Sequence, residues 1–181
     1  MQINHQKRIA GESADSTLPV IINLSFNVHG NEAAGSEAAL NTLYALISNP
    51  NKSISYVILI DPCINPDGRD RYVNWYNNAV GTQYNADPAA REHMEPWPAG
   101  RTNHYNFDLN RDWAWQTQIE TQQRLVAYHK WMPQVHVDFH EQGVDEPYYF
   151  APAAEPYHQD LNDQYVPEDQ MVTGSDSHQL W

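Results

Sequence analysis

Two histidines and one glutamate have the residue types and positions of a metal site. His29 and Glu32 stand three residues apart in the motif HGNE, directly after an apolar run, and His140 ends a second apolar segment far downstream. Two imidazoles and one carboxylate are the protein ligands that catalytic zinc favours, with the fourth position left to water. Because His-x-x-Glu is also common in polar loops, the surrounding elements must show whether these side chains can meet.

The first half of the chain reads as a strand, a helix and a second strand. Residues 18–28 and 54–61 are rich in β-branched and other apolar residues, as expected for strands covered on both faces. Between them, apolar residues recur at helical spacing and predict an amphipathic helix; these residues are Leu40, Leu43, Tyr44 and Ile47. The helix is expected to open at Gly35-Ser36 and to end before Pro50. This order predicts a right-handed βαβ unit with parallel strands.

The second half adds a predicted helix and a third strand. Residues 113–132 suit a helix that Pro133 stops, with Trp115, Ile119 and Val126 on one side. In the following segment QVHVDFH, apolar residues alternate with His136, Asp138 and His140, which share the opposite face.

If the three strands are parallel neighbours, their carboxyl ends form one rim of the sheet, where open α/β sheets bind ligands. His29, Asp61 and His140 would then lie on that rim. Ligands drawn from distant segments suit a catalytic site better than a closed structural one.

Two segments between the strands carry no clear apolar period. Asn65-Pro66-Asp67-Gly68 has the composition of a tight turn, since Pro fixes φ and Asp-Gly tolerates the left-handed region. Residues 74–107 predict a long ordered loop, because they are rich in Asn, Pro, Trp and Tyr. Loops of this length in a compact domain usually serve function.

The histidines near residue 140 also allow other assignments. His140-Glu141 begins like the motif His-Glu-x-x-His, but Val144 occupies the last position, so that motif fails. Glu141 is expected beside the ligands or at the rim, and His136 is expected to be a hydrogen-bonded buried histidine. The single cysteine, Cys63, is expected to be a small buried residue and excludes an internal disulfide or a Cys-rich zinc module.

The run Asn106–Trp113 places an acid, an amide and a guanidinium close together. Asp108 could accept the second ring N–H of a metal-bound histidine. Arg111 offers a planar fork matched to a carboxylate, and Asn110 adds a neighbouring donor. A surface ion pair of Arg111 with Asp108 or Asp112 is the alternative.

Composition limits the class of protein. The 181 residues are enough for one domain with a real core. The net charge of −13 argues against nucleic acid or an anionic membrane surface as partner. No apolar stretch approaches the roughly 18 residues of a membrane span.

Together, HGNE, NPDG, DLNR and DFH resemble the zinc carboxypeptidase family, the carboxypeptidase A type metallopeptidases, in order and spacing over roughly residues 20–150. The resemblance implies one Zn²⁺ held by His29, Glu32 and His140, with Asp108 supporting His29. It also implies that Asn110 and Arg111 bind the C-terminal carboxylate of a peptide or protein substrate. A further arginine that polarises the scissile carbonyl follows NPDG in the family, and Arg71 is the candidate, with Arg69 in reserve.

The same resemblance implies a general-base glutamate on a later strand, which is expected to be absent from this chain, since Glu155 and Glu168 lie in Pro-rich sequence. We therefore expect an internal piece of a larger enzyme, inactive alone, in which residues 1–17 are a linker or partial element. Residues 18–150 would be the partial catalytic domain, and residues 151–181 a Pro-rich, acidic-aromatic segment.

The expected fold is α/β, a mixed and largely parallel sheet with helices on both faces, truncated at both ends. The expected activity is C-terminal peptide-bond hydrolysis, in a secreted or periplasmic setting by family resemblance. A related zinc acyl-amide hydrolase, of the aspartoacylase and desuccinylase type, is the first alternative, and NPDG favours the peptidase. A zinc-binding or peptide-binding module without catalysis is the second.

Overall fold

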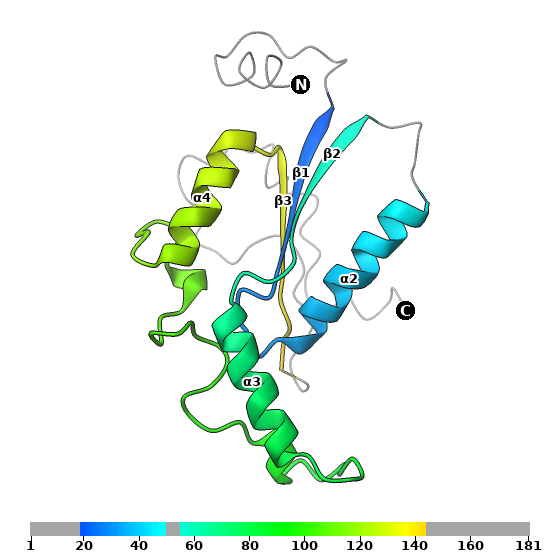
Figure 1. Ribbon diagram of the computed structural model, residues 1–181, viewed down its shortest axis with the longest axis vertical. Coiled ribbons are helices and arrows are strands. Elements are labelled where there is room, and N and C mark those ends of the chain that lie inside the picture. Colours follow the sequence, from blue (N-terminus) through cyan, green and yellow to red (C-terminus); the bar gives the residue numbers. More distant parts are fainter. Residues whose placement is uncertain (1–18, 50–54, 144–181) are drawn as a thin grey trace, which may run out of the picture. The chain divides into compact units, whose positions relative to one another are not determined.

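The computed structural model describes residues 19–49 and 55–143 (Figure 1). The strands are β1 (Val20–Phe26), β2 (Tyr56–Asp61) and β3 (Val135–Phe139). The α-helices are α2 (Ala33–Ser48), α3 (Pro66–Ala79) and α4 (Ile119–Trp131), and two short 3-10 helices are η1 (Arg91–His93) and η2 (Leu109–Arg111). The predicted segments 1–17 and 151–181 lie outside the described residues.

The three strands form one parallel sheet in the order β2-β1-β3. Ser25 pairs with Asp61 on one side and with Asp138 on the other, so all three strands run out at the same edge. The α/β class, the parallel βαβ unit and the shared rim predicted from the sequence are confirmed over these residues.

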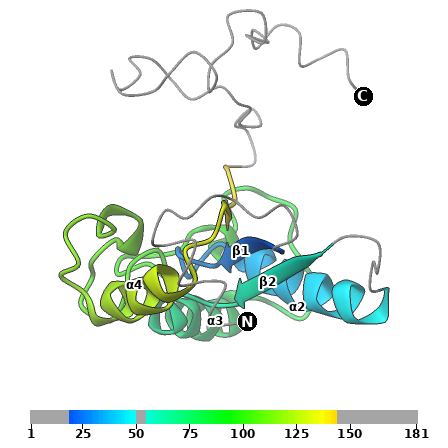
Figure 2. The ribbon, with the colours of Figure 1, turned by 90° about the horizontal axis from the view of Figure 1, so that it is seen from above.

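Helices lie on both sides of the strands. Figure 1 shows α4 on one side of the strands and α2 on the other. The β1–β2 crossover runs in one direction along the sheet and the β2–β3 crossover runs back past β1, so right-handed connections place their helices on opposite faces. In Figures 1 and 2, α3 lies between α2 and α4 and extends beyond the carboxyl ends of the strands. The helix ends and loops therefore gather around that edge.

The core beneath this edge is small and apolar. Val28, Ile64 and Leu109 form one buried cluster that joins the segments after β1 and β2 to η2. The rings of Phe26 and Phe139 stack with centroids 4.3 Å apart and an interplanar angle of 5°. These contacts hold the ends of β1 and β3 and the DLNR segment together.

Three boundary predictions were wrong. Residues 65–68 begin α3 instead of forming a turn, because Asn65 caps the helix by accepting from the Gly68 N–H and Pro66 stands in its first turn. The long irregular segment consequently starts after Ala79 instead of at 74. The predicted helix 113–132 begins only at Ile119, because the Asp112 carboxylate accepts from the N–H groups of Thr117 and Gln118 and so organises a turn there.

The predicted apolar faces of the helices are largely exposed. In α2, Leu40, Leu43, Tyr44 and Ile47 are exposed, whereas Gly35 and Ala39 are buried. Trp115, Ile119 and Val126 are also exposed. The small residues of α2 near its amino end are thus the ones that are covered. The four large apolar residues of α2 have no covering element in the described part of the chain. None of the described helices is long and apolar enough to cross a membrane.

Candidate metal centre

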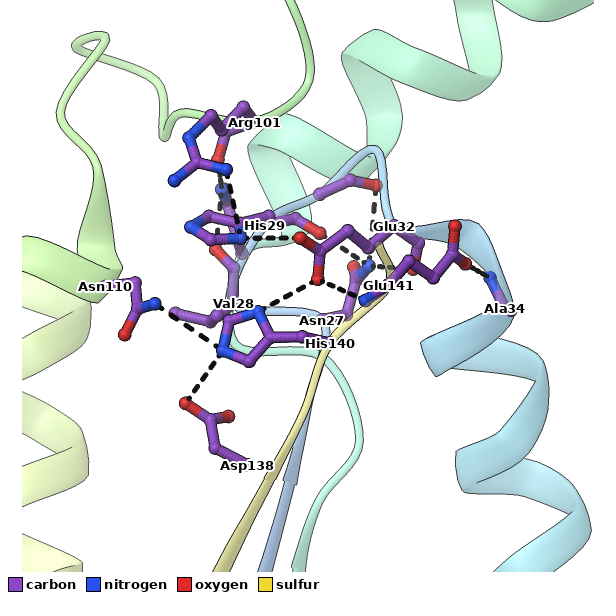
Figure 3. Close-up of polar contacts among 12 residues, drawn as sticks. Asn27, Val28, His29, Glu32, Ala34, Arg101, Asn110, Asp138, His140 and Glu141 are labelled. Atoms are coloured by element: carbon purple, nitrogen blue, oxygen red, sulfur yellow. Dashed lines mark hydrogen bonds and ion pairs between the residues drawn. The ribbon is translucent and has the colours of Figure 1, made fainter. Parts of the chain in front are cut away.

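Three side chains meet at the carboxyl edge of the sheet, as Figure 3 shows. His29 follows β1, Glu32 precedes α2, and His140 follows β3. Each offers one ligand atom, and these atoms all lie within 4.8 Å of one another. His29 Nδ1 lies 2.7 Å from Glu32 Oε1, and His140 Nδ1 lies 3.1 Å from Glu32 Oε2. The Nδ1 atoms of both rings are thus turned toward one carboxylate.

The outer nitrogens of both rings face carboxylates as well. His29 Nε2 lies 3.1 Å from Asp108 Oδ1, and His140 Nε2 lies 3.5 Å from Asp138 Oδ2. A ring whose Nε2–H donates to a carboxylate keeps its Nδ1 lone pair for a metal. Two imidazole nitrogens and one carboxylate with this support fit the requirements of zinc. Asp108 was predicted from the sequence as a partner of His29, whereas Asp138 was not proposed as a partner of His140, although it lies two residues before His140 on the same face.

Hydrogen bonds set the ionisation of the central pair. Burial raises the pKa of Glu32, but hydrogen bonds from His140, from His29 and from the Glu141 N–H outweigh it and bring the pKa to about 2. Hydrogen bonds to Asp138 and Glu32 raise the pKa of His140 to about 9 against the opposing effect of burial. Without metal, a protonated His140 therefore lies between two carboxylates.

Asp138 is itself held by neighbours on the α4 side of the sheet. The Ser25 hydroxyl donates to Asp138 Oδ1 at 2.8 Å. The Arg124 guanidinium, stacked 4.0 Å over the Trp113 ring, contributes a favourable charge. Burial raises the pKa of Asp138, and hydrogen bonds from His140 and Ser25 lower it below its ordinary value. The carboxylate behind His140 thus stays ionised.

Three glycines bring the surrounding loops into backbone contact. A Cβ on Gly30 would overlap the backbone of Gly68 and Arg69, and a Cβ on Gly68 would overlap the Gly100 carbonyl oxygen. A Cβ on Gly100 would lie 2.5 Å from the Gly68 oxygen. The HGNE loop, the start of α3 and the long loop can approach this closely only without side chains.

This junction places Arg101 beside the ring of His29. Its Nε and NH2 donate to Asp108 Oδ2 at 3.1 and 2.8 Å, and its NH1 lies 3.4 Å from His29 Nδ1 (Figure 3). Its side chain remains 43% exposed, so the guanidinium borders both the histidine and solvent. Arg101 was not predicted from the sequence, because residues 74–107 lack any apolar period that would indicate its orientation.

Arg71, the arginine expected at the site, lies elsewhere. Its NH1 donates to the carbonyls of Ala99 and Thr102, and its NH2 donates to the carbonyl of Asn103. The guanidinium is therefore engaged with the long loop and is not brought to the three-residue group. Arg69, the reserve, has its NH2 3.9 Å from Glu37 Oε1 on α2.

The predicted substrate-binding pair lies at the edge of the centre. Asn110 Nδ2 is 3.5 Å from His140 Nε2. Arg111 is exposed, and its NH1 donates to the Asn110 carbonyl at 3.1 Å. A guanidinium has five N–H donors. Within residues 19–49 and 55–143, Arg111 therefore has N–H donors that this one contact does not use.

The remaining polar candidates lie around the group. Glu141 donates its N–H to Glu32 and accepts from the Ala34 N–H at the start of α2. His136 is bonded to Ser25 Oγ at 2.9 Å and packs against aromatic rings, as expected of a satisfied histidine. Asp61 shares the rim but is not one of the clustered ligands, and burial raises its pKa. Cys63 is half-buried.

Comparison with known proteins gives one assignment. No curated protein and no solved structure matches the chain. A family model, described as zinc carboxypeptidase, matches residues 2–142 and so covers both histidines, Glu32 and the DLNR segment. Because the match spans most of the 181 residues, the chain belongs to the zinc carboxypeptidase family.

Proposed function

We propose that this chain holds zinc through His29 Nδ1, Glu32 and His140 Nδ1 and serves the hydrolysis of C-terminal peptide bonds. The observation that carries the proposal is the orientation of the two imidazoles. Both Nδ1 atoms face Glu32, and both Nε2 atoms face a carboxylate. When bound, zinc supplies a Lewis acid and lowers the pKa of water toward about 7.

Asp108 and Asp138 hold the rings in the tautomer that leaves Nδ1 free. Each accepts the Nε2–H of one histidine, so the rings cannot rotate without losing a hydrogen bond. Partners of this kind typically change metal affinity by about 10- to 100-fold. Asp138 is the weaker of the two contacts by distance, but Ser25 fixes its carboxylate.

Arg111 and Asn110 are the proposed binding site for the substrate carboxylate. A peptide C-terminus is an anion that a guanidinium can bind through two parallel hydrogen bonds. The exposure of Arg111 and the position of Asn110 next to His140 would place the last peptide bond near the metal ligands.

Arg101 is the proposed donor to the carbonyl oxygen of the scissile bond, the role for which the family resemblance made Arg71 the candidate. Its contacts with Asp108 hold the guanidinium beside His29. A fixed cation at this position would stabilise negative charge as it develops on that oxygen.

A general base is not evident among the residues that the structure describes. The nearby carboxylates are engaged by Arg101, His29, His140, Ser25 or the α2 amino end. Glu32 cannot both bind a metal and accept a proton. We therefore propose that the described residues bind zinc and the substrate carboxylate, and that proton transfer needs a group outside them.

The first test is zinc stoichiometry. The full chain should bind one zinc ion, His29→Ala should abolish stoichiometric binding, and His129→Ala on the exposed side of α4 should leave it unchanged. Zinc that still binds with the same affinity to His29→Ala would refute the ligand assignment.

The second test compares three ligands on the zinc-loaded chain: a peptide with a free C-terminus, its C-terminal amide, and an N-acyl amino acid. The free peptide should bind tightest, and Arg111→Ala should weaken it by about 10- to 150-fold, which corresponds to the 1.5–3 kcal/mol of a charged hydrogen bond. Arg91→Ala is the matched surface control. Equal binding of acid and amide would remove the Arg111 role, and preference for the N-acyl amino acid would favour the acyl-amide hydrolase.

A further inference from the structure

Asn27 links the end of β1 to the HGNE loop and is completely buried. Its φ is 59°, in the left-handed region that asparagine enters more easily than most residues. The extended backbone of β1 ends here, between the stacked ring of Phe26 and the buried Val28. This turn directs the next residues, including His29, away from the strand.

The Asn27 side chain binds the backbone of the loop that follows it. Nδ2 donates to the carbonyl of His29 at 3.0 Å and to that of Glu32 at 3.0 Å, and the Gly30 carbonyl lies 3.4 Å away (Figure 3). Two amide protons thus serve three carbonyl oxygens in one short loop. Two of those carbonyls belong to the clustered histidine and glutamate themselves.

The rest of Asn27 is fixed from the other side. Its backbone carbonyl accepts from the Asn65 N–H at 3.2 Å, and its Oδ1 accepts from the Cys63 thiol at 3.3 Å. Both partners belong to the segment between β2 and α3, which packs against the HGNE loop. The amide is therefore held in one orientation, with its N–H groups toward the loop.

Further hydrogen bonds hold the HGNE loop around the Asn27 side chain. Glu32 N also donates to the His29 carbonyl at 3.2 Å, which completes a tight turn with His29 and Glu32 at its ends. The carbonyls lie in a buried region and would be costly to leave unpaired. Because Asn27 donates to these carbonyls, the backbones of His29 and Glu32 are held at a fixed distance from each other before any metal binds.

We propose that Asn27 is a positioning residue that preorganises the His29–Glu32 pair for metal binding. The inference rests on the proposed zinc site but concerns a residue that contacts no metal. Its side chain sets the curvature of the ligand loop, so removal of its donors weakens metal affinity without removal of any ligand.

Two substitutions separate donor loss from strain and charge. Asn27→Asp keeps the size of the side chain and its tolerance of positive φ, but presents an oxygen where the N–H donors were. The added negative charge by itself would strengthen cation binding, so weaker binding would identify the lost geometry. Asn27→Gly removes the side chain and accepts the same backbone conformation without strain. Asn23→Asp on β1 is the control for charge.

Zinc affinity is measured by chelator competition on full-length, folded protein, and the absorption spectrum of bound cobalt(II) reports ligand geometry. Asn27→Asp and Asn27→Gly should each lose about 10- to 100-fold in zinc affinity, with altered cobalt bands. Asn23→Asp should stay within about twofold of the original chain. If Asn27→Asp does not fold, Asn27→Gly decides.

Unchanged affinity and an unchanged cobalt spectrum in Asn27→Gly would overturn this inference and leave the proposed function intact. Tighter zinc binding by Asn27→Asp would overturn it as well, because charge would then outweigh geometry. Absence of zinc binding by the unaltered chain would overturn the proposed function together with this inference.

Discussion

The free energy of unfolding of the metal-free chain should depend on pH through His140. It should fall as the pH rises. The pKa of His140 rises from 6.5 to about 9 in the folded chain, because Asp138 and Glu32 accept its ring protons. Folding therefore favours the protonated ring. The resulting stability is fully present below pH 6.5 and is lost as the pH rises through about 9.

The magnitude follows from the pKa difference. At 1.36 kcal/mol for each pH unit, the rise corresponds to about 3 kcal/mol. The His140 side chain is 31% exposed, and solvent screening reduces the effect to about 1–2 kcal/mol. Glu32 is the partner of His140 in this contact, and its pKa falls from 4.5 to about 2 in the folded chain. It therefore adds a second pH dependence, in the acid range. That part of the stability is present above pH 4.5 and is lost as the pH falls through about 2.

Urea unfolding of the chelator-treated chain from pH 6 to pH 9.5 measures the alkaline limb. Asp138→Asn removes the largest cause of the raised pKa and should flatten the decline. Ser25→Ala removes a hydrogen bond to Asp138 but leaves its charge, so it should lower stability at every pH and keep the slope. With saturating zinc the slope should reverse, since zinc binds the neutral imidazole. A wild-type slope in Asp138→Asn would refute the reasoning.

Three further predictions concern the framework. Leu109→Ala should lower the free energy of unfolding by about 2–5 kcal/mol in urea titrations, because a fully buried side chain leaves a cavity, and a loss below about 1 kcal/mol would contradict the packing. Gly30→Ala should lower the melting temperature and zinc affinity together, since its Cβ would overlap the backbone of Gly68; an unaltered melting curve would argue against that contact. Arg71→Met should speed proteolytic cleavage within residues 95–105 with little change in zinc affinity, because its guanidinium binds loop carbonyls there, whereas a selective loss of peptide binding would return Arg71 to the site.

The order and packing of the helices and strands could be predicted from the sequence better than the residues at which they begin and end. Apolar runs and one helical period are local signals, and right-handed crossovers convert them into a parallel sheet with one rim. The start of α3 was predicted as a turn because Asn, Pro, Asp and Gly favour both structures. Their order, with Asn65 as the cap and Pro66 directly after it, distinguishes a helix start.

The sequence alone could not indicate that Arg101, and not Arg71, lies beside His29. Arg71 lies closer to NPDG in sequence, but the position of Arg101 depends on contacts among Gly30, Gly68 and Gly100, which come from three separate segments. No local pattern contains that information. The role of Asn27 was missed for the same reason, since its amide contacts follow from a single positive φ and from burial.

The exposed stripe on α2 shows the limit of periodicity. Leu40, Leu43, Tyr44 and Ile47 identified the helix correctly, but they are exposed in the described part of the chain. Apolar spacing indicates that a face can be buried and does not specify the element that buries it.

The contact among Gly30, Gly68 and Gly100 also indicates which residues a redesign of this chain must keep and which segment it can replace. The spacing at this junction depends on backbone atoms, so rotamer changes nearby cannot alter it. The segment 80–94 follows α3, and hydrogen bonds such as that from the Asn85 N–H to Glu92 join residues of the segment itself, whereas Glu95 accepts from Asn31 and the Ala99 carbonyl accepts from Arg71 at the anchored end. Loop length has only a weak entropic cost. Segments of other lengths and sequences could therefore replace residues 80–94 between α3 and this anchor while Arg101 keeps its position beside His29.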